Sequence, residues 1–364
     1  MYTKEIKALK KSNRYRQRKI YDEKLVDLAS NDYLGLASNE EIFDKAYKRV
    51  KQEKFHSPKA SIVVNGYNKI HKEFEQILAK TNGFEDGLVV GSGFLANISL
   101  IEALVRKKDI LYIDEEYHAS GMVAIKTIQG EVNYFKHNDF NGLKNQIKNQ
   151  HSKYNRIIIA IEGVYSMGGD IAPKEFYDIA NEYNAILIVD EAHSSGVIGK
   201  NLLGWYDFYN LPILSNHIKM GTLGKAYGSY GAYILASSHI IEFLINRAKA
   251  VIYTTAPSVF DIALALESFL YIQENKKDIQ KRIKENLDII KDIFDLELYS
   301  LIVPIVVDDN KKVMHIQEEL IGLGYLVGAI RQPTVKKAII RLIAKIDIST
   351  KELKKVTLKI KEKL

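Results

Sequence analysis

The chain has 364 residues, of which 46% are hydrophobic and 27% charged, and it contains no cysteine. This composition is ordinary for a globular protein and excludes disordered and fibrous classes. The lack of cysteine excludes disulfides, thiolate metal sites, iron–sulfur clusters and a cysteine nucleophile. The net charge of +7 raises the question of a nucleic acid or another anionic partner.

The N-terminal region is rich in Lys and Arg and reads as a basic helix over about the first 20 residues. A solvated surface face explains these charges equally well. The region lacks the apolar core of a signal peptide, and no stretch of the chain approaches the ~18 consecutive apolar residues of a membrane helix. We therefore expect a cytoplasmic protein that does not contact a membrane.

The middle of the chain alternates between short apolar runs and helical patterns. Helices are predicted over 94–105, 120–127, 140–149 and 173–183, and strands over 87–91, 109–113, 132–135, 156–161, 185–190, 217–221 and 230–235. Continuous Ile/Val strands separated by helices indicate an α/β fold whose mostly parallel sheet is covered on both faces.

The pattern changes after two long predicted helices at 258–272 and 277–294. A small α+β unit follows, with strands at 301–307, 325–330 and 338–343 and helices at 312–323 and 351–364. We expect three parts: an N-terminal arm (1–45), a large α/β domain (46–260), and a small α+β C-terminal domain (261–364) that begins with interdomain helices.

Polar side chains follow several of the predicted strands, where open α/β sheets bind their ligands. Gly91-Ser-Gly93 opens a helix and suits an anion, although a tight turn explains these glycines too, and Ala96 breaks a dinucleotide fingerprint. Asp114–His118, Glu162–Asp170 and Asp190–His193 follow three further strands. Singly, such an Asp is often a helix cap. Polar segments after three predicted strands in a row favour a functional site over three separate helix caps.

Lys225 lies in the turn Gly221–Gly228, which is no phosphate P-loop because Lys219 and Ala226 occupy required positions. With 52 Lys and Arg, a surface lysine is the default interpretation. Beside an anion site and an Asp–His pair, however, a desolvated amine can attack an aldehyde. Pyridoxal phosphate needs such an amine, a carboxylate at its pyridine nitrogen, a donor near its phenolic oxygen, and amides and hydroxyls for its phosphate.

Six segments occur in an order that resembles the α-oxoamine synthases, which are fold-type I pyridoxal-phosphate transferases. The resemblance runs from about residue 28 to about residue 344. The segments are Ser30–Leu36, Gly91–Asn97, His118–Ser120, Glu162–Met167, Asp190–His193 and Thr222–Lys225.

The resemblance implies roles for individual residues. Lys225 binds the cofactor covalently, Asp190 pairs with the pyridine nitrogen, His193 reaches the phenolic oxygen, and His118 stacks on the ring. Gly93, Phe94, Ser166 and Thr222 also contact the cofactor, and Thr254 and Thr255 reach the phosphate of a neighbouring subunit, so a homodimer with shared active sites is expected. The implied substrate contacts are Asn31 and Arg331 for the amino-acid carboxylate, Thr334 beside them, and Arg16 or Arg14 for the acyl group.

Within the family, the resemblance is strongest to the branch that serves biotin synthesis. It implies a decarboxylative condensation of L-alanine with a pimeloyl thioester carried by coenzyme A or an acyl carrier protein. One departure leaves the acyl specificity open: residues 56–66 lack the family's glycines and offer Lys59 as their only Lys or Arg.

Several alternatives stay open. Glycine and an acetyl thioester could react at the same site. An aminotransferase or decarboxylase is disfavoured by Asn31 and by His118-Ala-Ser. A silent partner subunit is disfavoured by the presence of Lys225. Nucleic-acid binding rests on the net charge alone, and no recognition motif supports it.

Overall fold

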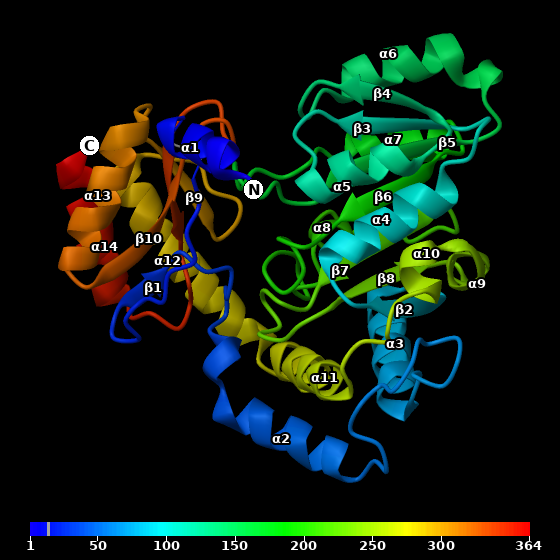
Figure 1. Ribbon diagram of the computed structural model, residues 1–364, viewed down its shortest axis with the longest axis horizontal. Coiled ribbons are helices and arrows are strands. Elements are labelled where there is room, and N and C mark those ends of the chain that lie inside the picture. Colours follow the sequence, from blue (N-terminus) through cyan, green and yellow to red (C-terminus); the bar gives the residue numbers. More distant parts are fainter. Residues whose placement is uncertain (13–14) are drawn as a thin grey trace.

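The computed structural model describes residues 1–12 and 15–364, which form two lobes, each built on a sheet (Figure 1). The larger sheet has seven strands in the order β2-β8-β7-β6-β5-β3-β4, and its neighbouring strands are parallel from β7 to β4. The strands are β2 (Asp86–Val90), β3 (Ile110–Asp114), β4 (Glu131–Phe135), β5 (Ile157–Glu162), β6 (Ile186–Asp190), β7 (His217–Thr222) and β8 (Ala232–Ala236). The expected α/β fold with a mostly parallel sheet is confirmed.

Helices cover both faces of this sheet because its strands are apolar on both sides. Tyr112 and Ile159 pack into one core, whereas Leu111 and Ile158, next to them in the strands, pack into the other. One face carries α4 (Gly93–Leu104), α5 (Ala119–Ala124), α9 (Ser238–Arg247) and α10 (Lys249–Ile252). The other carries α3 (Lys69–Asn82), α6 (Phe140–Gln150), α7 (Glu175–Glu182), α8 (Trp205–Phe208) and α11 (Val259–Glu274).

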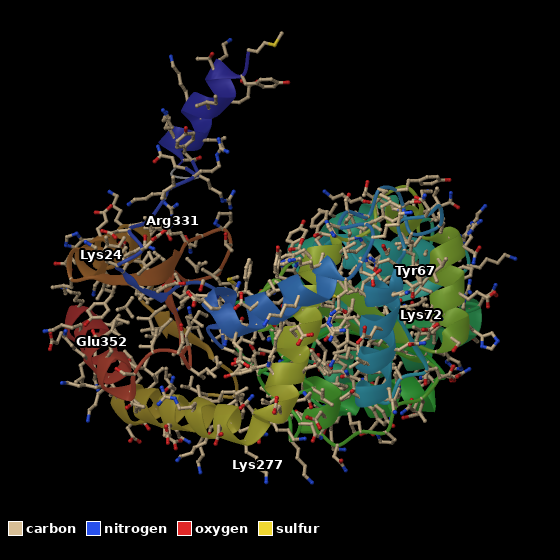
Figure 2. The ribbon with its side chains drawn as sticks, turned by 90° about the horizontal axis from the view of Figure 1, so that it is seen from below. Lys24, Tyr67, Lys72, Lys277, Arg331 and Glu352 are labelled. Atoms are coloured by element: carbon tan, nitrogen blue, oxygen red, sulfur yellow. The ribbon has the colours of Figure 1, made fainter. Side chains whose placement is uncertain are left out.

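The smaller lobe is built on a four-stranded sheet in the order β1-β10-β11-β9. Its strands are β9 (Ile302–Val306), β10 (Tyr325–Ile330), β11 (Ile339–Ile343) and β1 (Val26–Leu28), which comes from the N-terminal arm and runs parallel to β10. The helices α12 (Lys276–Phe294), α13 (Asn310–Gly322) and α14 (Thr350–Lys363) pack in this lobe, and α12 leads into it from α11. Figure 2 shows Lys24, just before β1, on the same lobe as Glu352 of α14.

The rest of the arm is helical at its two ends. Helix α1 (Thr3–Lys11) has no buried residue and projects from the body of the protein in Figure 2. Its extent is shorter than the basic helix predicted from the sequence. Helix α2 (Glu40–Lys51) packs against α11. Three short 3-10 turns occur at Leu36–Ser38, Ile125–Thr127 and His151–Lys153. No helix of the described residues has the length and apolar character needed to cross a membrane.

Candidate active site

Two buried carboxyl groups meet at the ends of the central strands. Glu162 ends β5 and Asp190 ends β6, and the parallel register places these residues opposite each other. Glu162 is 1% exposed and Asp190 is 3% exposed. Burial, together with the negative charge of Asp190, raises the pKa of Glu162 well above its ordinary value. Burial and the nearby negative charge therefore favour the neutral form of Glu162.

Asn97 of α4 fixes the orientation of the Asp190 carboxylate. Its amide Nδ2 donates to Asp190 Oδ2 at 2.8 Å and lies 2.8 Å from Ser120 Oγ. Its Oδ1 accepts from the Tyr117 hydroxyl at 2.6 Å. The other carboxylate oxygen, Oδ1, accepts from the backbone N–H of Ala192 at 3.0 Å. These two donors fix the orientation of a carboxylate that can pair with a protonated ring nitrogen.

Lys225, His193 and Tyr33 form a line of hydrogen-bonding groups. Lys225 Nζ lies 2.7 Å from His193 Nε2, and the Tyr33 hydroxyl lies 2.5 Å from His193 Nδ1. Burial lowers the pKa of Lys225 to about 8, although the charge of Asp190 acts in the opposite direction. Burial and the charge of Lys225 keep the pKa of His193 well below its ordinary value. The result is a neutral imidazole beside an amine that loses its proton near physiological pH.

An anion-binding cradle lies at the start of α4. Ser92 Oγ accepts from the backbone N–H of Leu95 at 3.3 Å, and the backbone N–H groups of the residues after Ser92 lie in the first turn of the helix. Gly93 lies against Thr222 at the end of β7, since a Cβ on this glycine would be 3.7 Å from the Thr222 Cβ. Phe94 leaves its side chain 46% exposed. A helix N-terminus with a hydroxyl beside it suits a phosphate group.

His118 connects to the same network from β3. Its ring is exposed, and its Nδ1 lies 2.7 Å from the Ser120 hydroxyl, which also contacts Asn97. The exposed ring remains available for stacking against a flat group. The turn before it is held by His137, whose Nδ1 lies 3.2 Å from Asp114 Oδ1 and whose Nε2 lies 2.8 Å from Asp170 Oδ2. Although burial opposes it, the two carboxylates raise the pKa of His137 to about 10.

Arg341 reaches the site from β11 of the smaller lobe, and the sequence analysis did not single it out. It is 5% exposed, and its Nε donates to the Ser166 carbonyl oxygen at 2.9 Å. Ser166 is itself buried, and its backbone N–H donates to Glu162 Oε2 at 3.1 Å. Among the described residues, no carboxylate forms an ion pair with Arg341. The sequence feature that could have pointed to Arg341 is its place as a lone arginine within the apolar strand Ile339–Ile343.

A further contact between the lobes joins the loop after β10 to the turn before His118. Lys336 Nζ lies 2.8 Å from Glu116 Oε1 and 3.9 Å from Glu115 Oε1. All three side chains are at least partly exposed. This ion pair joins the two lobes beside the turn that precedes His118.

The remaining predicted residues lie outside this hydrogen-bonded cluster, with one exception. Asn31 belongs to it, because its Oδ1 is 3.4 Å from the Tyr33 hydroxyl. Arg331 lies at the end of β10, where Figure 2 shows it on the smaller lobe, and its carbonyl accepts from the N–H of Thr334 at 3.0 Å. The exposed Arg16 is in the arm, and Arg14 lies outside the described residues. Thr254 and Thr255 follow α10. The roles of these residues stay predictions.

Comparisons with known proteins agree with this geometry. The aminotransferase class I and II family matches residues 23–360. The chain is 42% identical to the 8-amino-7-oxononanoate synthase of Helicobacter pylori, covering 98% of this chain and 95% of that protein. A crystal structure of 8-amino-7-oxononanoate synthase from Francisella tularensis is 27% identical with a TM-score of 0.76, covering 94% of this chain and 98% of that one.

A solved serine palmitoyltransferase from S. paucimobilis shares the fold, with a TM-score of 0.88 at 22% identity over 99% of this chain and 96% of that one. These findings confirm the resemblance recognised from the motifs. The chain belongs to the aminotransferase class I and II family.

Proposed function

We propose that the chain catalyses the pyridoxal-phosphate-dependent condensation of L-alanine with a pimeloyl thioester, with release of carbon dioxide and the thiol. This is the reaction of an 8-amino-7-oxononanoate synthase in biotin biosynthesis. The observation that supports it most directly is the buried amine of Lys225, 2.7 Å from a neutral His193 and near the carboxylate of Asp190. The similarity to a named synthase over nearly the full length supports the substrates.

The residues of the cleft fit pyridoxal phosphate. Lys225 offers an amine of lowered pKa for the aldehyde, and Asp190 offers an oriented carboxylate for the pyridine nitrogen. The start of α4 with Thr222 suits the phosphate, and the exposed His118 ring suits the flat face. When bound, the cofactor withdraws electrons from the α-carbon of the amino acid and so stabilises negative charge there.

The protein's own groups then place and deprotonate the amino acid. Arg341 is a buried guanidinium on the cleft side of β11, so we assign it the alanine carboxylate, with Asn31 beside it. Lys225, once its amine is free, is placed to accept the α-proton, since a pKa of about 8 leaves a substantial neutral fraction at pH 7.5. Asp190, which Asn97 and the Ala192 N–H hold in place, would pair with the ring nitrogen.

We further propose that the enzyme works as a homodimer. Thr254 and Thr255 lie next to Tyr253, which is 81% exposed, and Val64 in the altered loop is 73% exposed. The loop and this segment are joined, because the Ala256 N–H donates to the Ala60 carbonyl at 3.0 Å. Exposed apolar side chains beside the predicted shared-site residues support a subunit interface here.

The test is a panel of donors and acceptors with the cofactor-loaded enzyme. Alanine, glycine and serine are each combined with acetyl- and pimeloyl-thioesters of coenzyme A and of acyl carrier protein, and the released thiol is measured. We expect turnover with alanine and the pimeloyl thioesters. Turnover of glycine with acetyl-coenzyme A, and none with alanine, would assign the chain to a different acyl transfer at the same site.

A further inference from the structure

A buried lysine outside the cleft faces three carboxylates. Lys345 follows β11 and is 5% exposed. Its Nζ lies 3.7 Å from Asp27 Oδ2, 3.6 Å from Asp32 Oδ2 and 3.5 Å from Asp347 Oδ2. A buried ammonium is stable only when it is paired with opposite charge. Asp347 belongs to the same turn as the lysine, whereas Asp27 and Asp32 belong to the N-terminal arm, so the cluster joins two parts of the chain.

The other oxygen of each arm carboxylate accepts hydrogen bonds from backbone N–H groups near Asn31. Asp27 Oδ1 accepts from the N–H groups of Ala29 at 2.9 Å and Ser30 at 3.0 Å. Asp32 Oδ1 accepts from the N–H of Leu36 at 3.0 Å. Since the second oxygen of each carboxylate faces Lys345, the ammonium fixes the turns on both sides of Asn31.

The same segment also touches the active site. The N–H of Ile346, next to Lys345, donates to the Tyr33 carbonyl at 3.1 Å. The Tyr33 hydroxyl lies 2.5 Å from His193, which in turn contacts Lys225. A continuous series of contacts therefore runs from the Lys345 ammonium, through the arm segment, to the reactive amine.

The packing around Gly35 shows how closely the two parts fit. Gly35 has a φ of +69°, and a Cβ at this position would lie 2.4 Å from the Asp347 Cβ. Both the left-handed backbone and the contact with Asp347 require glycine. The arm segment thus rests directly on the turn that carries Lys345.

We propose that Lys345 is a positioning residue that sets Asn31 and Tyr33 at the active site by tying Asp27 and Asp32 of the arm to the end of β11. Removing the ammonium leaves three carboxylates facing one another, so the arm segment moves away from the turn. The effect falls on binding of the amino acid, because the proposed function assigns Asn31 to its carboxylate. The proposal rests on the proposed function for its substrate, but not for its structural part.

The experiment compares four variants by two measurements. Lys345→Met removes the charge, Asp27→Asn removes a carboxylate but keeps an acceptor for Ala29 and Ser30, and Lys345→Arg restores a cation. Arg282→Met is the control, since Arg282 Nη2 donates to the Ile346 and Ile348 carbonyls at 3.1 and 2.9 Å and touches neither arm carboxylate. Hydrogen exchange at Ala29, Ser30 and Leu36 is measured without cofactor, and KM and kcat for alanine with it.

In Lys345→Met and Asp27→Asn we expect hydrogen exchange at these amides to accelerate about tenfold or more, because a buried ion pair loses one partner. We also expect KM for alanine to rise about tenfold, with a smaller change in kcat. Lys345→Arg restores both values to within about threefold. Arg282→Met changes neither by more than about twofold.

Unchanged exchange at these amides in Asp27→Asn would overturn the proposal, and so would equal effects in the Arg282→Met control. If Lys345→Met does not fold, Asp27→Asn decides the question. Exchange is measured without substrate, so accelerated exchange in a protein that does not turn over alanine would overturn the proposed function and leave the positioning role standing.

Discussion

Asn97 makes three buried hydrogen bonds, and its replacement by alanine is the sharpest test of the network around Asp190. The variant loses the bond to the Asp190 carboxylate at 2.8 Å, the contact with Ser120 at 2.8 Å and the bond from Tyr117 at 2.6 Å. A hydrogen bond to a charged group contributes about 1.5–3 kcal/mol and a neutral one about 0.5–1.5 kcal/mol. We therefore expect the free energy of unfolding of the cofactor-free protein to fall by roughly 3–5 kcal/mol.

The assay for stability is urea unfolding followed by fluorescence, which the single tryptophan, Trp205, makes possible because it is fully buried. Ser99→Ala is the control, since Ser99 lies on the same helix and its hydroxyl donates to the Leu95 carbonyl at 2.7 Å, within the helix itself. We expect it to cost about 1 kcal/mol or less. Cofactor affinity, measured by absorbance titration, should fall about tenfold in Asn97→Ala, which corresponds to ~1.4 kcal/mol.

The reasoning about this network is refuted if Asn97→Ala unfolds at the same urea concentration as Ser99→Ala and binds the cofactor with the affinity of the parent. A loss of stability without a loss of cofactor affinity would show that Asn97 supports the fold but does not orient Asp190.

Three further predictions concern groups around the cleft. Replacing His137 by glutamine lowers the free energy of unfolding by roughly 2–3 kcal/mol below pH 6.5. The difference from the parent disappears as the pH rises through about 10, because the parent ring loses its proton there. Urea unfolding at a series of pH values checks this prediction. In the cofactor-free parent, the folded state releases the Lys225 proton near pH 8 while the unfolded state keeps it to about pH 10.4, so stability rises with pH between these values; Lys225→Met lacks that rise and retains no cofactor after borohydride reduction. Lys336→Gln, which breaks the pair with Glu116, raises KM for alanine by up to about fivefold at low salt and less at high salt, whereas Lys337→Gln, whose lysine pairs with Asp308 in its own lobe at 3.3 Å, leaves KM unchanged.

Much of the large sheet could be predicted from the sequence because its strands are continuous apolar runs. The runs at 109–113, 156–161 and 185–190 appear as β3, β5 and β6 within a residue or so. The strand β1 was missed, because a three-residue strand has no periodicity of its own and exists only through pairing with β10. Helices α2 and α3 were also missed, although both have asparagine caps at their N-termini.

The candidate site was predictable where a motif follows a strand. Lys225, Asp190, His193 and His118 each follow a predicted strand, and the structure joins their side chains in one network at the carboxyl ends of the strands. Their roles stay predictions. Arg341 was missed since its strand belongs to the other lobe, and only tertiary contact shows that it reaches Ser166. The resemblance assigns the amino-acid carboxylate to Arg331, which forms no hydrogen bond with the cluster in the part of the chain that the structure describes. That role stays a prediction.

The chemistry of the cleft depends on how the two lobes are held together. Tyr33 reaches His193 from the arm, and Arg341 reaches Ser166 from β11, so two of the bonds that define the site cross from one lobe to the other. A shift of the smaller lobe would lengthen both bonds at once, and it would admit water to Lys225, whose pKa is low because the amine is buried. Contacts far from the reacting atoms, such as that of Lys345 with the arm, therefore matter because they hold Tyr33 and the smaller lobe in place at the site.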